Sequence, residues 1–300
     1  MPDICTQCPR ECGVSRVGKE LGFCSVPATF TVARIALHAW EEPSISGENG
    51  SGTIFFSGCN LRCVFCQNHE VSHSALGKEI SPERLAKEML RLQDMGAHNV
   101  NLVTPTQYAE QLIPVLERVK PHLQIPIVYN CGGYEKVETL SKLDGLVDIY
   151  LPDVKYFDAD KAQAYSGAKD YFPVAMAALG EMLRQRGSYR FDENGLLQSG
   201  VIVRHLVLPG GKKDSVRLLG EIAARFGTQD LLLSLMSQYT PTFATACPYP
   251  ELHRRITSFE YDTVLKEARR LGFEGYLQAR TSATADFTPD FHETTFQKDT

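Results

Sequence analysis

Three of the nine cysteines lie in one short stretch whose spacing suits an iron–sulfur cluster with an open iron. Cys59, Cys63 and Cys66 form the pattern C-x3-C-x2-C directly after an apolar run. Three thiolates can hold three irons of a cubane cluster, which leaves the fourth iron open to a reacting molecule. A structural zinc site is closed by four protein ligands. The spacing therefore predicts a catalytic [4Fe-4S] centre; the alternatives are incidental cysteines or a zinc ion completed by a distant histidine.

A second group of four cysteines lies near the N-terminus, at Cys5, Cys8, Cys12 and Cys24. The segment around them is rich in turn-forming residues and too poor in apolar residues to form its own core, so a bound metal would supply folding energy. Four thiolates satisfy either a tetrahedral zinc ion or a closed second iron–sulfur cluster. We expect residues 1–30 to be a metal-binding segment; reduced surface thiols are the alternative.

The elements that position these cysteines alternate along the chain. Strands are expected at 53–58, 99–104, 125–130, 147–152, 200–208, 231–236 and 275–279, and helices at 81–96, 107–120, 135–143, 159–186, 215–226 and 259–271. Strands that alternate with helices predict an α/β fold with a mostly parallel sheet. About six such units predict a partial (β/α)6 barrel over residues 31–285, followed by a polar tail over 286–300. Functional side chains should follow the carboxyl ends of the strands.

Composition excludes several classes of protein. A chain of 300 residues with 43% hydrophobic and 22% charged residues is not wholly disordered. A net charge of −5 argues against nucleic-acid or anionic-membrane partners. The first residues lack the apolar core of a secretory signal, and no apolar run approaches the roughly 18 residues of a membrane span. We therefore expect a soluble, cytoplasmic protein, in which clustered cysteines bind metal more often than they form disulfides.

The stretch GTIFFSGCNLRCVFCQN closely resembles the cluster loop of radical S-adenosylmethionine (radical SAM) enzymes, in particular glycyl-radical-enzyme activating enzymes of the pyruvate formate-lyase type. The resemblance implies that Cys59, Cys63 and Cys66 hold a [4Fe-4S] cluster whose open iron binds SAM. One electron then cleaves SAM, and the 5′-deoxyadenosyl radical abstracts a hydrogen atom. Phe65 would lie beside the adenine, and Asn68 matches the asparagine that follows the last cysteine.

Later strand ends are similar to the same family. The resemblance places Asp153 and Lys155, in DIYLPDVK, near SAM, and makes Arg204, in VRHLVLPG, a candidate for the SAM carboxylate. Asn130 follows the third strand, where the family usually has aspartate. Cys131 beside it is interpreted as a cofactor contact or as a small buried side chain.

Two strand ends depart from the family pattern. Thr104 and Thr106 stand where the family has Gly-Gly-Glu-Pro, and Gln238 stands nearest the place of a SAM-pocket histidine. The polar groups of these residues could still contact SAM. Before the first predicted strand, the run EEPSISG contains Glu42, which could also face the site.

The resemblance implies a substrate and partners. The hydrogen atom would come from a glycine in a partner protein, a glycyl-radical enzyme, and the electron from a low-potential donor such as flavodoxin or ferredoxin. A radical SAM enzyme that modifies a small molecule or peptide is one alternative. A non-enzymatic zinc or iron–sulfur interaction protein is another, but it explains only the N-terminal cysteines.

Overall fold

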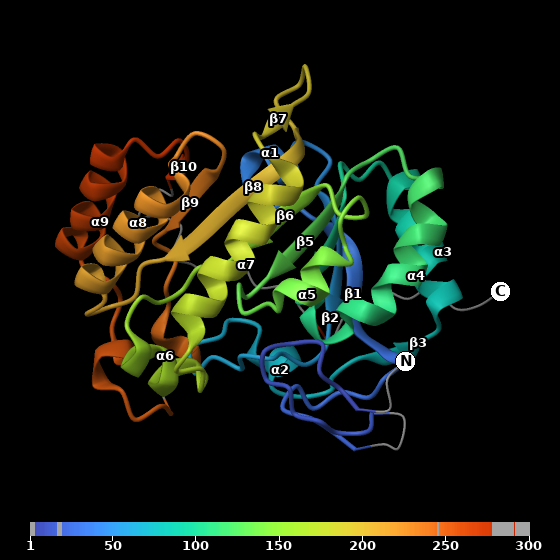
Figure 1. The fold of residues 1–300 in the computed structure, drawn as a ribbon, viewed down its shortest axis with the longest axis horizontal. Helices are drawn as coiled ribbons and strands as arrows, with labels where there is room; N and C mark the ends of the chain where they lie inside the picture. Colours follow the sequence, from blue (N-terminus) through green and yellow to red (C-terminus); the bar gives the residue numbers. More distant parts are fainter. Residues whose placement is uncertain (1–3, 17–19, 245, 278–290, 292–300) are drawn as a thin grey trace.

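The computed structural model describes residues 4–16, 20–244, 246–277 and 291, and shows an α/β fold around one mostly parallel sheet (Figure 1). The strand order is β10-β9-β8-β6-β5-β4-β2-β1-β3, with β7 beside β8. The strands are β1 (Phe30–His38), β2 (Ser51–Phe56), β3 (Lys78–Ile80), β4 (Val100–Val103), β5 (Ile127–Cys131), β6 (Ile149–Pro152), β7 (Arg190–Phe191), β8 (Leu197–Leu206), β9 (Leu232–Met236) and β10 (Gly275–Leu277).

Along the sheet, β10, β9, β8, β6, β5, β4 and β2 each pair in parallel with the next strand of this series. Strands β1, β3 and β7 form the antiparallel pairs: β1 with β2 and β3, and β7 with β8. Strands β2, β4, β5, β6, β8 and β9 are each followed by helix before the next parallel strand. Within the described residues, β10 and β3 are the two edges of the sheet and do not pair with each other. The predicted parallel α/β architecture is confirmed, and the sheet is an open one.

Helices α3–α5 and α7–α9 cover one face of the sheet (Figure 1). Each buries an apolar stripe against the strands, as the helical spacing of the sequence predicts. The helices are α1 (Pro43–Ser46), α2 (His69–Ser72), α3 (Pro82–Asp94), α4 (Ala109–Val119), α5 (Val137–Ser141), α6 (Ala159–Ser166), α7 (Tyr171–Arg186), α8 (Lys212–Phe226) and α9 (Ser258–Leu271), with short 3-10 turns at Thr106–Tyr108, Lys120–His122, Pro241–Phe243 and Pro250–His253.

Local sequence explains where these elements begin and end. The hydroxyl of Ser81 accepts a hydrogen bond from the backbone N–H of Arg84, and Pro82 is the first residue of α3. The predicted helical stretches over 159–186 are α6 and α7, which are separate because Gly167 adopts a left-handed φ of +59° and ends α6. Every residue of β2 is buried, as is typical of a strand covered on both faces.

The register of the sheet brings distant residues to one edge. Asn130 pairs with Val103 on one side and with Leu151 on the other, and an isolated bridge joins Asp153 to Arg204. The carboxyl ends of β5, β6 and β8 therefore lie side by side, at the edge where the prediction placed the functional residues.

The sequence did not predict every element of the fold. Some of the predicted elements fall on residues that the structure does not describe. Strands β1, β3 and β7 were not predicted. The last strand was expected at 275–279 and is seen at Gly275–Leu277; residues 278 and 279, and the predicted tail 286–300 apart from Phe291, lie outside the described residues. None of the described helices is both long and apolar enough to cross a membrane.

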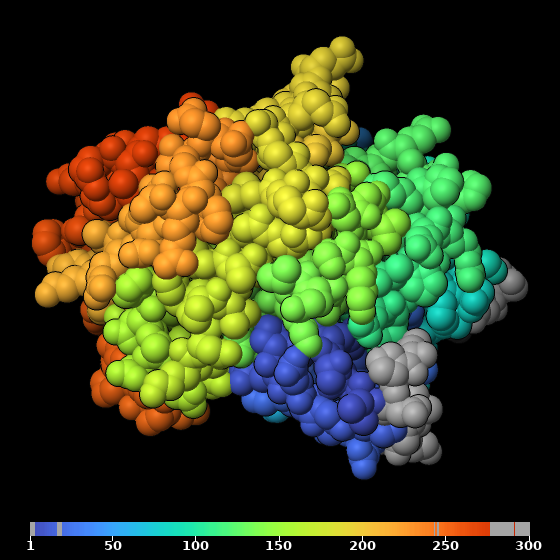
Figure 2. All heavy atoms as spheres, viewed as in Figure 1, coloured from blue at the N-terminus to red at the C-terminus, as the bar shows by residue number. Residues whose placement is uncertain are grey.

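Residues 4–16 and 20–29, here called the N-terminal segment, contain no helix or strand. The segment lies against the carboxyl-terminal edge of the sheet, beside α2 (Figure 1), and forms part of the molecular surface there (Figure 2). Its cysteines are thus on the same side of the molecule as the strand ends.

Candidate functional site

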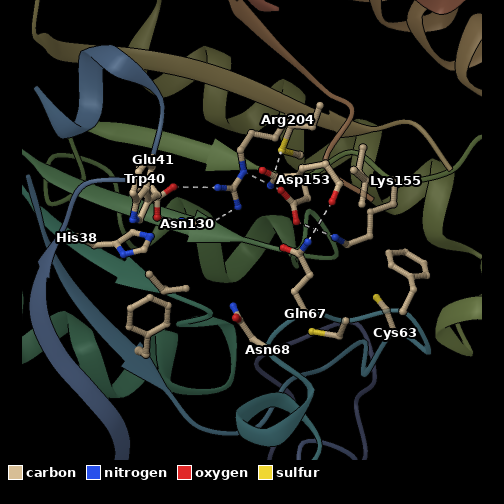
Figure 3. A pocket seen from close by; sticks show the side chains of 17 residues that line it. His38, Trp40, Glu41, Cys63, Gln67, Asn68, Asn130, Asp153, Lys155 and Arg204 are labelled. Atoms are coloured by element: carbon tan, nitrogen blue, oxygen red, sulfur yellow. Dashed lines mark hydrogen bonds and ion pairs between the residues drawn. The ribbon is translucent and has the colours of Figure 1, made fainter. Parts of the chain in front are cut away.

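A cavity that is open to solvent lies at the carboxyl ends of the parallel strands (Figure 3). We call it the main cavity. Its lining comes from β1 and the residues after it, β2, the cysteine loop (residues 58–68), β4, β5, the ends of β6 and β8, and the end of β9. It includes most of the residues that the sequence predicted for the site: Cys63, Phe65, Cys66, Asn68, Asn130, Asp153, Lys155, Arg204 and Gln238.

A network of charges occupies one wall of the main cavity (Figure 3). The guanidinium of Arg204 donates to Asp153 Oδ1 (Nε, 2.8 Å), Glu41 Oε2 (Nη1, 3.0 Å) and Asn130 Oδ1 (Nη2, 2.6 Å). Lys155 Nζ lies 2.7 Å from the other oxygen of Asp153. Two cations and two carboxylates therefore face one space, which can receive a ligand that carries both charges.

Burial and ion pairing oppose each other in this network. Burial disfavours the ionised form of Asp153, but the attraction of Arg204 and Lys155 outweighs it and lowers the pKa of the carboxyl. Burial likewise opposes the charge on Lys155, yet Asp153 raises the pKa of the ammonium. Burial raises the pKa of Glu41 although Arg204 acts in the opposite direction. Asp153 is thus the stable anion of the site, and Glu41 is the more easily protonated one.

The three cysteines of the loop present their sulfurs to neighbouring hydrogen-bond donors. Cys59 Sγ accepts from the backbone N–H of Leu61 (3.3 Å), Cys63 Sγ from the hydroxyl of Ser166 (3.0 Å), and Cys66 Sγ from the hydroxyl of Ser72 (3.3 Å). Such bonds stabilise thiolate ligands and tune a bound cluster.

Burial favours the neutral form of two of these thiols when no metal is bound. Burial, with the neighbouring thiols, raises the pKa of Cys59 to about 12 and that of Cys66 to about 11. A positively charged cluster would offset that cost. Cys63 and Cys66 line the main cavity, whereas Cys59 lies outside its lining. Three soft donors on one loop, two of them facing the cavity, fit a cluster with an iron open toward that space.

Phe65 and Gln238 lie on the cavity wall beside the cysteines. The Phe65 ring packs edge-on against Tyr156, Tyr165 and Tyr239, with centroid distances of 6.3–6.4 Å. Gln67 donates to the backbone carbonyl of Gln238 (3.3 Å), which joins the cysteine loop to the end of β9. The aromatic ring and the amide side chains of this wall carry no charge, in contrast to the charged wall.

Thr104 and Thr106, like Cys59, are predicted site residues that do not belong to the lining of the main cavity. The hydroxyl of Thr106 donates to the buried carboxylate of Glu135 (2.5 Å). The carbonyl of Thr104 accepts from the side chain of Gln107 (2.8 Å), which also donates to Ser57 O (2.9 Å). Thr104 has a left-handed φ of +57°, so the chain turns away from the strand direction directly after β4. These polar groups stabilise the protein interior beneath the cavity.

Sequence reasoning missed the contribution of β1. His38, Trp40 and Glu41 line the main cavity, and Glu41 takes part in the charge network. Glu42, the acid that we expected could face the site, is instead buried outside the lining, and its Oε2 has no hydrogen-bond partner among the described residues. The apolar run before the EEP sequence could have indicated a strand that delivers Glu41.

Comparisons with known proteins agree with this geometry. Residues 53–216 match the family model of the radical SAM superfamily. The uncharacterized protein MJ0674 of Methanocaldococcus jannaschii is 29% identical over 90% of this chain and 75% of its own length. The pyruvate formate-lyase-activating enzyme of Clostridium pasteurianum is 27% identical over 62% of this chain and 75% of its own.

Solved structures resemble the fold more distantly. Methylornithine synthase (PylB) has a TM-score of 0.48 at 15% identity, and the match covers 72% of this chain and 63% of that protein. Streptococcus suis SuiB, bound to S-adenosylmethionine, has a TM-score of 0.47 at 14% identity, with 74% and 48% covered.

Proposed function

The chain belongs to the radical SAM superfamily, and we propose that it reductively cleaves S-adenosylmethionine and abstracts a hydrogen atom from a glycine of a partner protein. One observation carries the proposal for SAM. Arg204, Lys155, Asp153 and Glu41 offer both signs of charge in the same cavity that Cys63 and Cys66 face.

The charged wall suits the amino-acid end of SAM. Arg204 and Lys155 would bind the carboxylate, and Asp153 and Glu41 the ammonium. In the structure each cation is paired with a carboxylate, so ligand entry exchanges one set of ion pairs for another. No charge is left buried and unpaired in either state, which avoids the largest electrostatic cost of binding.

The wall that carries the cysteines and Phe65 would hold the cluster and the adenine. Cys59, Cys63 and Cys66 would bind the [4Fe-4S] group, and Phe65 would lie against the base. When bound, the reduced cluster supplies the one electron that breaks the S–C5′ bond of SAM and yields methionine and the 5′-deoxyadenosyl radical. The protein's own part is to position SAM and to keep water from the radical, for which the apolar ring packing around Phe65 is suited.

The proposal of a glycine substrate is based on similarity to another protein. The similarity to an activating enzyme of pyruvate formate-lyase supports a glycine of a glycyl-radical enzyme as the hydrogen donor. The electron would come from a low-potential donor protein of the flavodoxin or ferredoxin class. The open mouth of the main cavity could admit a loop of such a substrate.

An isotope experiment tests both parts. Anaerobically reconstituted protein is reduced with dithionite and mixed with SAM and pyruvate formate-lyase whose glycines carry deuterium. We expect 5′-deoxyadenosine containing one deuterium and the electron paramagnetic resonance signal of a glycyl radical. Unlabelled 5′-deoxyadenosine without the radical signal would contradict the glycine substrate and retain SAM cleavage. With a filled, reducible cluster, absence of 5′-deoxyadenosine would count against the cleavage itself.

A further inference from the structure

All four cysteines of the N-terminal segment line one small cavity, which we call the thiol cavity. We propose that Cys5, Cys8, Cys12 and Cys24 hold a second iron–sulfur cluster, seated directly against the loop that carries Cys59. This inference concerns a different set of ligands from the main cavity and does not depend on the substrate proposed above.

Backbone hydrogen bonds bring the four thiols together. Cys5 N–H donates to Val14 O (3.0 Å) and Gly13 N–H donates to Cys5 O (3.1 Å), which closes the chain into a narrow loop around Cys8. A second turn, with Ser25 N–H on Gly22 O (2.9 Å), presents Cys24 to the same space. The segment has no helix or strand to hold this arrangement. A metal bound by all four thiols would stabilise it, as in other small metal-bound loops.

An unpaired buried donor also points into this region. Arg16 lines the thiol cavity and is only 6% exposed, and its Nε has no hydrogen-bond partner among the described residues. A buried N–H without an acceptor is costly, whereas a metal-bound thiolate or sulfide would accept from it. Arg10 lines the same cavity. Two guanidinium groups would offset the negative charge that four thiolates bring to a metal centre.

The buried donor favours a cluster over a single ion. A cubane cluster brings sulfides of its own, which can accept from Arg16 Nε in addition to the thiolates. A zinc ion brings no acceptor of its own and is closed by its four protein ligands. Four thiolates leave no iron of a cluster open.

The thiol cavity shares a wall with the catalytic loop. Asn60, the residue after Cys59, lines the thiol cavity, and its carbonyl accepts from Arg10 Nε (2.8 Å). Gly58 packs so closely that a Cβ there would lie 2.4 Å from the carbonyl oxygen of Cys24. The second cluster would therefore lie next to the loop that carries Cys59, and so beside the first cluster.

Two variants, each with several cysteines replaced, allow the two sites to be studied separately. The triple variant C59A/C63A/C66A retains only the N-terminal ligands, and the quadruple variant C5S/C8S/C12S/C24S only the catalytic ones. After anaerobic reconstitution, we expect about four irons and four sulfides in each and about eight in the full protein. Mössbauer spectra of the triple variant should show a cubane cluster. Zinc without iron, or no metal, in a triple variant whose circular dichroism shows a folded chain would overturn the proposal. SAM cleavage plays no part in this readout.

A milder change tests the site without removing a ligand. A Cβ at Gly22 would lie 2.5 Å from Cys12 Sγ, so Gly22→Ala forces that sulfur to move. A free thiol can turn away, but a ligating one cannot do so without weakening its bond. In the triple-variant background we expect iron to be lost to a chelator about 10-fold faster. Gly220→Ala, where the added Cβ meets no atom within 4 Å, is the matched control. Equal rates in the two variants would show that Cys12 does not ligate the cluster.

Discussion

Asp153, directly after β6, pairs with Arg204 of β8 through an isolated parallel bridge, and the ion pair between Arg204 Nε and Asp153 Oδ1 measures 2.8 Å. The other two nitrogens of the guanidinium reach Glu41 from β1 and Asn130 from β5. One side chain thus joins three separate parts of the sheet. A planar fork with several donors can make such contacts together, whereas an ammonium group at the same place cannot.

Arg204→Lys should therefore weaken SAM binding while it keeps the positive charge. Loss of charge-assisted hydrogen bonds worth about 1.5–3 kcal/mol each corresponds to roughly a 10- to 100-fold higher Kd. Equilibrium binding of SAM to the reconstituted, unreduced protein measures the change. Arg225→Lys, on the exposed face of α8, is the control and should leave the Kd unchanged. Equal Kd values for the two variants would remove Arg204 from the SAM site.

Cys63→Ala should abolish formation of 5′-deoxyadenosine, because the cluster would lose one of only three protein ligands. The readout is chromatography after dithionite reduction, together with iron content. Cys247→Ala, which changes a cysteine outside both groups, is the control and should retain activity. Undiminished SAM cleavage in the Cys63 variant would contradict the ligand assignment.

Ser166→Ala should lower the reduction potential of the catalytic cluster. The hydroxyl of Ser166 donates to Cys63 Sγ (3.0 Å), and such bonds stabilise the more negative, reduced state. One hydrogen bond of about 1 kcal/mol corresponds to roughly 40 mV for one electron. A redox titration followed by electron paramagnetic resonance measures the shift. Ser141→Ala removes an exposed hydroxyl that donates to the carbonyl of Glu138, far from the cysteines in the sequence, and is the control whose potential should not change. A rise in the Ser166 variant would refute this prediction.

Glu135→Gln should change how stability depends on pH. Burial raises the pKa of Glu135 from 4.5 to about 7, although hydrogen bonds from Thr106 and Tyr129 act against it. The folded state then binds more protons than the unfolded state between about pH 4.5 and 7, so this carboxyl costs stability as the pH rises through that window. The variant should gain up to about 3 kcal/mol relative to the parent across the window.

Urea unfolding at several pH values, on identically prepared proteins, provides the measurement for Glu135. Glu138→Gln, at an exposed position nearby, is the matched control and should run parallel to the parent protein. If the difference between Glu135→Gln and the parent does not vary with pH, the buried carboxyl does not titrate in this range.

Functional residues tend to follow the carboxyl ends of parallel strands. This rule explains which site residues could be predicted from the sequence. Asp153, Lys155 and Arg204 follow apolar runs of the repeating units, and the structure brings them together in one cavity. The rule did not predict Glu41, because this residue follows the antiparallel strand β1, which is not one of the repeating strand–helix units. Its partner Arg204 is 163 positions away, and no local pattern encodes that contact.

Thr106 shows the opposite case. It follows a correctly predicted strand, yet it contacts Glu135 in the protein interior. The reason is the left-handed backbone of Thr104, together with partners that only the folded chain supplies, such as Gln7, whose side chain donates to Gln107 O (2.8 Å). A strand end predicts the edge of the sheet at which a residue lies, but not the direction in which its side chain points.

Asn60 has a consequence for how the protein matures. Its carbonyl is held by Arg10, its side chain donates to Tyr134 O (2.6 Å), and it is bonded to Cys59. Filling the N-terminal site would order Arg10 and with it the backbone next to Cys59, so the loop would be preformed when the catalytic cluster arrives. Loading of the N-terminal site would then speed loading of the catalytic one. During assembly of the full protein, native mass spectrometry should find few chains that carry a single cluster, and the quadruple variant should fill its catalytic site with iron more slowly than the full protein fills the same site.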